Sequence, residues 1–144
     1  MSEKKNLPVM SRLGVIFLTW RRYLQKDLLP YGITLKQMYV LRQLDIKAYL
    51  HPAEIADILF CDRPTATVII KNMKRYGWIE QERDPENAKR FRITITPAGR
   101  DKLCSIAGSK PKTAFDPLEC FTPDELSQFE ALLKKLSKHM DRFI

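Results

Sequence analysis

Residues 52–83, PAEIADILFCDRPTATVIIKNMKRYGWIEQER, decide the fold. The first nine of them place apolar side chains at helical spacing, which predicts a short helix over 52–60. Asp62 is suited to cap a second helix, which tolerates Pro64 in its first turn and ends at Gly77. Two helices joined by a tight break form a helix-turn-helix.

The hydrophobic pattern changes its period after this second helix. Residues 78–83 and 91–96 are predicted to be strands, because apolar and polar side chains alternate in the second segment. The residues between them, 84–90, are polar and turn-prone, so we expect a hairpin with a long, charged tip. A hairpin that follows a helix-turn-helix makes a winged helix.

Two further helices are predicted on the N-terminal side. The first starts at Ser11 and is ended by Pro30 and Gly32. Its apolar residues recur at helical spacing: Leu13, Phe17, Trp20, Leu24 and Leu28. The second starts at Thr34, whose hydroxyl forms a capping box with the amide of Gln37.

The C-terminal part is predicted to be helical as well. Thr96 and Pro97 start one helix, which we expect to be interrupted at residues 108–111. Thr122 and Glu125 form a capping box that starts the last helix. Its apolar residues follow in alternating steps of three and four, the pattern of a helix packed along another helix: Leu126, Phe129, Leu133, Leu136, Met140 and Phe143.

These elements predict a mainly α fold with a small β-hairpin wing, an α+β winged helix-turn-helix. A chain of 144 residues fits one domain, residues 1–144. Within it we expect residues 33–96 to form the winged-helix lobe. Residues 11–30 and 97–144 are expected to supply dimerisation helices, since a chain of this length has little core left to bury both apolar stripes. Alternatively, the two stripes pack together within one chain.

The charge of the chain favours a polyanionic partner. The sequence carries a net charge of +8, which favours nucleic acid first and an anionic membrane surface second. Nine basic and five acidic residues lie between Phe60 and Arg100. This excess is modest, so the order of the elements supports nucleic-acid binding more strongly than the charge does.

The outer face of the helix that follows Asp62 is the candidate DNA-reading surface. Residues near the N-terminus of a recognition helix reach base edges, and a Thr or Val methyl group can contact thymine. Arg63 is suited to a guanine edge, whereas the later basic residues suit phosphates. The predicted contact residues are Arg63, Pro64, Thr65, Thr67, Val68, Lys71, Lys74 and Arg75. Alternatively, the charges among them form a solvated helix face.

The hairpin supplies a second set of candidate DNA contacts. A projecting Arg or Lys suits the narrow minor groove, with its enhanced negative potential. The predicted contacts are Arg83, Asn87, Lys89 and Arg90, with Lys89 and Arg90 at the hairpin tip. Alternatively, these charges keep an exposed hairpin soluble.

Several segments, in this order and spacing, resemble the motifs of the MarR family of transcriptional regulators. They are ITLKQMYVL (33–41), AEIA (53–56), DRPTAT (62–67), YGWI (76–79), RDPENAK (83–89) and ITPAG (95–99). Three positions depart from the family pattern. Asn87 stands where the family has an Asp, Lys89 where it has an Arg, and Val68 where it often has a basic residue.

The resemblance implies a homodimer that binds a palindromic operator in double-stranded DNA. It implies a repressor that a small aromatic or anionic effector releases, with Trp20, Tyr23 and Tyr39 as weak candidates for the effector site. The dimer interface is expected to contain Leu13 and Phe17 together with the apolar residues of the last helix. No cofactor is expected.

Some residues are also compatible with other functions. Cys61, at a helix N-terminus beside Arg63, suits a thiol-based redox sensor, although redox-sensing relatives carry their cysteine near the start of the first helix. A winged helix used as a protein-interaction module is the other alternative. No motif predicts an enzyme or a metal site, and three cysteines at irregular spacing with no membrane-length apolar run predict a cytoplasmic protein.

Overall fold

The computed structural model describes residues 7–108 and 116–143. The chain forms two compact units, residues 1–109 and 110–144.

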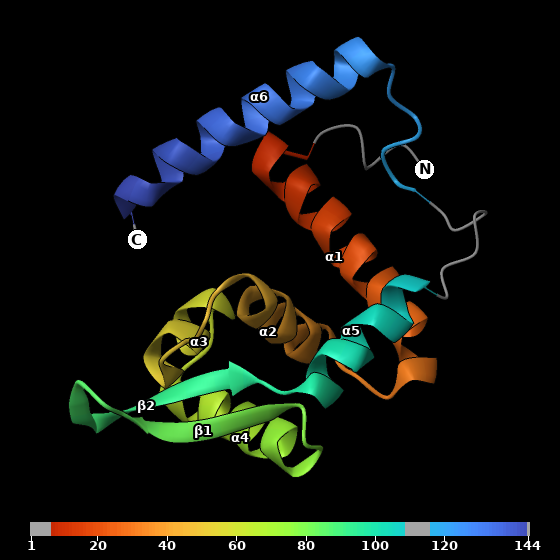
Figure 1. Ribbon diagram of the computed structural model, residues 1–144. Helices are drawn as coiled ribbons and strands as arrows, with labels where there is room; N and C mark the ends of the chain where they lie inside the picture. Colours follow the sequence, from red (N-terminus) through yellow and green to blue (C-terminus); the bar gives the residue numbers. More distant parts are fainter. Residues whose placement is uncertain (1–6, 109–115, 144) are drawn as a thin grey trace. The chain divides into compact units, whose positions relative to one another are not determined.

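The first unit contains five α-helices and a two-stranded hairpin among its described residues (Figure 1). In chain order they are α1 (Val9–Leu28), the 3-10 turn η2 (Leu29–Tyr31), α2 (Leu35–Ile46), α3 (Pro52–Ile58), α4 (Arg63–Arg75), β1 (Ile79–Asp84), β2 (Asn87–Ile95) and α5 (Pro97–Gly108). The predicted fold class, mainly helical with a small hairpin, is confirmed.

The core of this unit lies where α2, α3 and α4 meet the hairpin. Leu41, Ile55, Met73 and Ile93 have less than 2% of their surface exposed. Leu50, in the loop before α3, is equally buried and forms an antiparallel bridge with Ile93 of β2. This bridge ties the start of the helix-turn-helix to the hairpin.

The predicted helix boundaries follow from caps that the structure contains. Thr34 and Gln37 form the expected capping box at the start of α2. Asp62 caps α4, and Gly77 follows that helix with a φ of 76°. Positive φ is accessible to Gly without steric penalty, so Gly77 lets the chain turn from α4 into β1.

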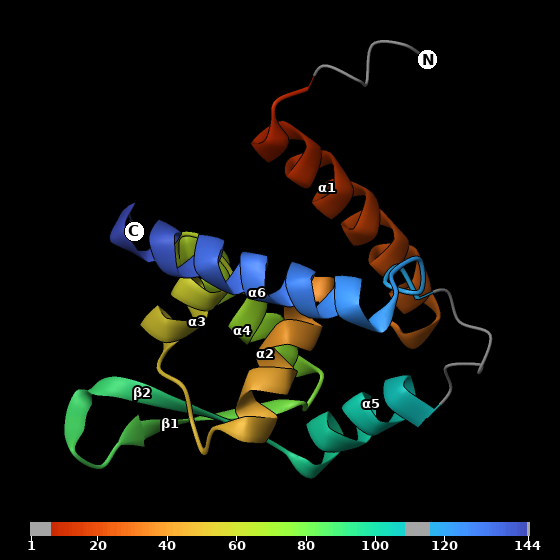
Figure 2. The same ribbon diagram turned by 90° about the horizontal axis from the view of Figure 1, so that it is seen from above.

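The hairpin differs from the prediction at its tip. The two strands extend to Asp84 and from Asn87, so that the turn contains Pro85 and Glu86 alone. Arg83 pairs with Phe91 and Asp84 with Asn87, which leaves residues 88–90 as a bulge in β2. The predicted seven-residue tip is therefore wrong, and Lys89 and Arg90 lie in the bulge. In Figures 1 and 2 the tip of the hairpin extends beyond α2, α3 and α4 of the same unit.

The apolar stripe of α1 is buried at one end alone. Leu28 is 2% exposed and packs into the core, whereas Ile16, Phe17 and Leu18 are each more than half exposed. The first helix therefore contributes to the core of this unit through its C-terminal end.

The second unit contains α6 (Pro123–Met140) and the 3-10 turn η3 (Asp141–Phe143). Thr122 and Glu125 form the predicted capping box at the start of α6. Phe121 stacks on Phe129 with ring centroids 5.2 Å apart. None of the residues of α6 is buried. The interruption expected at residues 108–111 lies mostly outside the described residues.

Candidate nucleic-acid interface

The predicted DNA-reading face of α4 is exposed along its whole length. Ala66, Ile70 and Met73 turn into the core, and Ile69 is half-buried against it. All the predicted contact residues of this helix are exposed: Arg63, Pro64, Thr65, Thr67, Val68, Lys71, Lys74 and Arg75.

Hydrogen bonds fix the first turn of α4. The Asp62 carboxylate accepts a hydrogen bond of 2.7 Å from the backbone N–H of Thr65. Hydrogen bonds from the side chain and backbone of Thr65 lower the pKa of Asp62 below its ordinary value of 3.8. The Thr67 hydroxyl donates to the backbone carbonyl of Arg63 over 2.9 Å. The front of the helix is therefore ordered by its own side chains.

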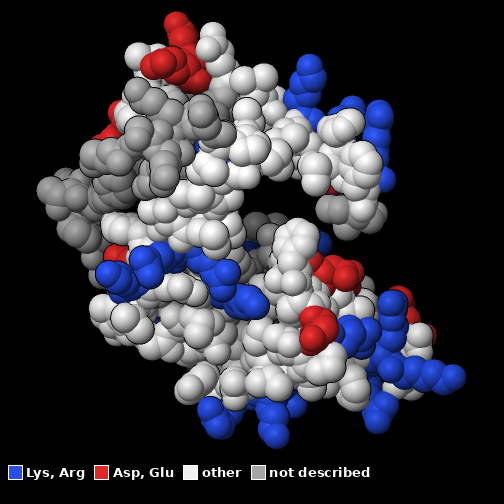
Figure 3. Space-filling model, turned by 180° about the vertical axis from the view of Figure 1, so that it is seen from behind, with Lys and Arg blue, Asp and Glu red and all other residues white. Residues whose placement is uncertain are grey.

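A groove of about 520 Å³ runs between α4 and the hairpin. It is lined by Pro52, Arg63, Thr67, Ile70, Lys71, Lys74, Gln81 and Phe91. Figure 3 shows Lys and Arg side chains along the lower edge of the molecule, where α4 and the hairpin lie. Three basic side chains of one helix thus border a single groove, an arrangement that suits a polyanion.

Side-chain bonds to the backbone hold the bulge of β2. Arg83 donates from Nη1 to the carbonyl oxygen of Ala88 over 2.6 Å, and its guanidinium lies 5.2 Å from the centre of the Phe91 ring. The Asn87 Oδ1 accepts from the backbone N–H of Lys89 over 3.1 Å. Arg83 and Asn87 therefore shape the hairpin, and they leave Lys89 and Arg90 exposed.

A buried carboxylate anchors the hairpin to the rest of the unit. Asp84 is 6% exposed, and its Oδ1 lies 3.1 Å from Nη2 of Arg92. Its Oδ1 also accepts from the Glu86 backbone N–H over 2.9 Å, and its Oδ2 lies 3.6 Å from Nε2 of His51. The Glu86 hydrogen bond, aided by the charges of Arg92 and His51, lowers the pKa of Asp84 despite its burial.

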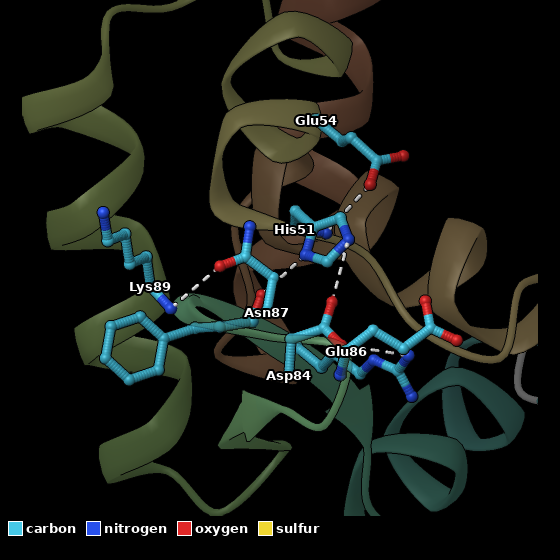
Figure 4. A network of polar contacts seen from close by, with 8 residues as sticks. His51, Glu54, Asp84, Glu86, Asn87 and Lys89 are labelled. Atoms are coloured by element: carbon cyan, nitrogen blue, oxygen red, sulfur yellow. Dashed lines mark hydrogen bonds and ion pairs between the residues drawn. The ribbon is translucent and has the colours of Figure 1, made fainter.

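His51 joins this carboxylate to the start of α3. Its Nδ1 is 2.9 Å from the Phe91 carbonyl oxygen, and its backbone N–H donates to Oε1 of Glu54 (Figure 4). The guanidinium of Arg92 lies 4.1 Å from the centre of the Tyr49 ring. The sequence interpretation missed this network. The Asp84–Pro85 pair indicated a turn, but nothing local linked it to His51, 33 positions earlier.

The residues predicted for an effector lie on two helices, α1 and α2. Trp20 and Tyr23 stack on α1 with centroids 5.3 Å apart, and Tyr39 is exposed on α2. A cavity of about 270 Å³ where α1, α2 and α4 meet is lined by other residues: Arg21, Gln25, Thr34, Leu35, Lys36, Gln37, Ile69 and Asn72. The effector residues stay a prediction.

The predicted dimer residues lie on two exposed faces. Phe17, Leu133 and Phe143 have 54%, 39% and 72% of their surface exposed. Leu13, Leu126, Phe129 and Leu136 are half-buried, and Met140 is exposed. These residues keep the apolar stripes that the sequence predicted.

The remaining chemistry-bearing groups are dispersed. Cys61 is half-buried against the core, and Cys104 and Cys120 are exposed. Within residues 7–108 and 116–143, no three His, Cys, Asp or Glu side chains are placed to hold a metal ion. Over the same residues, no helix has the length and hydropathy needed to cross a membrane.

Comparisons with known proteins identify relatives of this fold and sequence. The model of the MarR family matches residues 31–90. The multiple antibiotic resistance protein MarR of Salmonella typhimurium is 27% identical over 117 residues, 80% of this chain and 81% of that protein. The HTH-type transcriptional regulator YsmB of Bacillus subtilis, itself uncharacterised, is 27% identical over 112 residues, 78% of this chain and 77% of YsmB.

Solved structures of the same fold cover nearly the whole chain. A crystal structure of MarR superposes with a TM-score of 0.80 at 22% identity, covering 96% of this chain and 95% of that one. A mutant of MarR from E. coli complexed with operator DNA superposes with a TM-score of 0.80 at 23% identity, covering 94% and 98%. The predicted winged helix is confirmed.

Proposed function

We propose that the chain, which matches the MarR family model over residues 31–90 and is 27% identical to MarR of Salmonella typhimurium, is a MarR-type transcriptional regulator that binds double-stranded DNA through α4 and the hairpin. The observation that carries the proposal is the fully exposed outer face of α4, with Arg63, Lys71 and Lys74 bordering the groove beside the hairpin. A helix exposed in this way can enter a major groove, while the hairpin follows the adjacent backbone.

The side chains of α4 have different roles at different positions along the helix: the first turn contacts bases and the later turns contact phosphates. Arg63 lies in the first turn, where a guanidinium can bond the O6 and N7 atoms of guanine. Lys71, Lys74 and Arg75 lie about two to three turns later and neutralise phosphates, which adds affinity without sequence information. Lys89 and Arg90, exposed in the bulge, are suited to the minor groove.

The regulator acts as a homodimer in this proposal, because an operator of two half-sites needs two copies of α4 about one helical turn of DNA apart. The exposed stripes of α1 and α6, with Phe17 and Leu133 among them, supply the dimer contacts. The whole chain then works as one domain in the cytoplasm. Binding represses transcription, and a small aromatic or anionic molecule releases the DNA.

Fluorescence anisotropy with labelled duplexes tests DNA binding. The duplex is one selected by the protein from a random pool, and a scrambled duplex is the comparison. Because several phosphates are neutralised, the logarithm of the affinity should fall linearly and steeply with the logarithm of the salt concentration. Equal, salt-insensitive affinity for both duplexes would overturn the proposal.

Two variants test the division of labour on α4. Arg63→Ala should reduce the preference for the selected duplex over the scrambled one, by about 1–3 kcal/mol. Lys71→Ala should weaken binding to both duplexes alike. It should also lower the slope of log affinity against log salt concentration by about one. Identical effects of the two variants on preference and slope would contradict these roles.

A further inference from the structure

The outermost ridge of α4 is apolar at its front and basic at its rear. Residues two positions apart lie about 200° apart around a helix, so Pro64 and Val68 stand opposite the buried Ala66 and Ile70. Lys71 and Arg75 continue the same ridge toward the C-terminus. Val68 is 57% exposed. The side chains that project farthest from the core near the front of the helix therefore carry no hydrogen-bonding atom.

The two threonines beside this ridge donate their hydroxyl protons to groups at the start of α4. The hydroxyl of Thr67 donates its proton to the carbonyl of Arg63 over 2.9 Å. The Thr65 side chain is hydrogen-bonded to Asp62. A base edge that approaches the front of α4 therefore meets Pro64, Val68 and the methyl-bearing Thr67, with Arg63 on one flank.

The major groove offers one apolar group to such a surface. Each base pair shows a pattern of donors and acceptors there, and thymine adds its C5-methyl group. A valine gains nothing from a donor or an acceptor, but it gains from contact with a methyl group, since both are then removed from water. A polar base edge under Val68 would instead lose hydrogen bonds to water.

We propose that Val68, supported by Pro64, reads the C5-methyl group of a thymine, so that each half-site has an A·T pair beneath this residue. The inference rests on the proposed function and specifies its substrate: a duplex whose recognition depends on thymine methyl groups. Lys71 and Arg75, on the same ridge, hold the flanking phosphates and bring Val68 to the groove.

Replacing single thymines by deoxyuracil tests this directly, because the exchange removes one methyl group and keeps the Watson–Crick pair. Starting from a duplex selected by the wild type, each thymine is replaced in turn and the affinity is measured by anisotropy. At one position of each half-site we expect a loss of about fourfold, equivalent to about 0.8 kcal/mol for one buried methyl group.

Variants of the chain identify the residue that senses the methyl group. In Val68→Ala, the ratio of affinities for the thymine and deoxyuracil duplexes should fall from about four to about one. Val68→Thr should keep a ratio above about two, because it retains a methyl group and its hydroxyl can bond the carbonyl of residue 64. Ile46→Ala, which truncates an 81%-exposed residue on α2, is the matched control and should leave the ratio at its wild-type value.

The outcomes separate this inference from the proposed function. A wild type that selects no preferred duplex overturns both. If the wild type selects a duplex but its affinity falls less than about twofold at every deoxyuracil position, the proposed function stands and the proposed contact with a thymine methyl group is overturned. A fourfold loss that persists in Val68→Ala assigns the methyl contact to another residue and overturns the role of Val68.

Discussion

Helices α4 and α6 carry comparable apolar stripes but bury them differently. In α4, Ala66, Ile70 and Met73 are 4% exposed or less. In α6, no residue is buried, and Leu133 and Met140 are each 39% exposed. A periodic apolar stripe thus shows that a face must be covered, without showing whether the same chain or a second copy covers it.

This difference in burial distinguishes two parts of the molecule. One part covers its apolar side chains within the chain, and the other leaves them exposed. The helix-turn-helix and hairpin bury side chains from α2, α3, α4 and β2 against one another. The front half of α1 and all of α6 leave apolar residues exposed. Substitutions in the first part should change folding, and those in the second should change association.

The largest effect is expected for Leu41→Ala in α2. Leu41 is 0% exposed, and truncation leaves a cavity as well as losing the burial of the removed atoms, so we expect a loss of about 2–5 kcal/mol in the free energy of unfolding. Urea denaturation followed by circular dichroism measures it. Ile46→Ala, in the same helix but 81% exposed, should change stability by less than about 0.5 kcal/mol. Similar losses for both variants would contradict a core completed within this lobe.

The next effect belongs to α6. Leu133→Asp places a charge in the apolar stripe, where association would have to remove it from water. We expect the dissociation constant of the homodimer to rise more than about 100-fold, equivalent to about 2.7 kcal/mol. Analytical ultracentrifugation measures it.

A matched control separates charge from position in α6. Ala131→Asp adds the same charge on the face away from the stripe and should leave the dissociation constant within about threefold of the wild type, as surface substitutions do. The thermal unfolding of the winged-helix lobe should be retained in both variants. Loss of the dimer in both variants would show that charge alone, and not the stripe, governs association.

Much of the secondary structure could be predicted from the sequence, since helix boundaries depend on local patterns. The capping boxes at Thr34 and Thr122, the N-cap at Asp62 and the turn at Gly77 are all present. Each depends on residues within four positions of one another, and cap chemistry is read from such short windows.

The hairpin tip could not be predicted in the same way. Residues 84–90 are polar and have turn propensity, but residues 87–90 lie in β2. The Arg83 bond to the Ala88 carbonyl and the Asn87 bond to Lys89 hold the extended backbone there. Composition indicates a turn, whereas these side-chain bonds to the backbone determine its length.

One part of the candidate site could be predicted from a local pattern, and the other part could not. Helical period alone placed the outer face of α4, and the structure exposes every residue assigned to it. The contacts of Asp84 with His51 and Arg92 join separate segments. The pairing of such residues depends on the tertiary fold, which no sequence window contains.

A smaller effect is expected from the buried carboxylate of Asp84, which tests whether polar contacts within the winged-helix lobe also stabilise it. Asp84→Asn removes the negative charge that pairs with Arg92, so we expect the melting temperature at pH 7 to fall by about 5 °C. The folded-state pKa of Asp84 lies below its ordinary 3.8. Its ionised form therefore stabilises the fold above that pH, and this stabilisation is lost as the pH falls through the folded-state pKa.

The pH dependence supplies the control for this variant. The melting temperatures of the wild type and of Asp84→Asn should converge as the pH falls from 5 to 3, as measured by calorimetry. Glu86→Gln, which keeps the backbone N–H that bonds Asp84, should follow the wild-type profile. A difference that stays constant from pH 7 to pH 3 would show that the charge of Asp84 does not stabilise the lobe.

The smallest effect concerns an exposed apolar residue that lies on no stripe. Phe60, between α3 and α4, has a φ of 51° and is 86% exposed. The left-handed conformation costs a non-glycine residue about 1–2 kcal/mol, and Asn tolerates it better than most. Phe60→Asn should therefore raise the free energy of unfolding by about 0.5–1 kcal/mol, measured by urea denaturation.

The dimer dissociation constant of Phe60→Asn also tests the role of α6. Because Phe60 belongs to no periodic apolar face, Phe60→Asn should leave the dimer dissociation constant unchanged, in contrast with Leu133→Asp. Phe60→Ala is the matched control: it removes the ring but keeps the unfavourable φ, so it should not gain stability. If Phe60→Asn weakened the dimer, exposure of an apolar side chain alone would indicate an association surface. The periodic spacing of apolar residues in α6 would then be no evidence for a dimer interface. An unchanged dimer would show that the spacing of exposed apolar residues, more than their exposure, marks the face that a second copy covers.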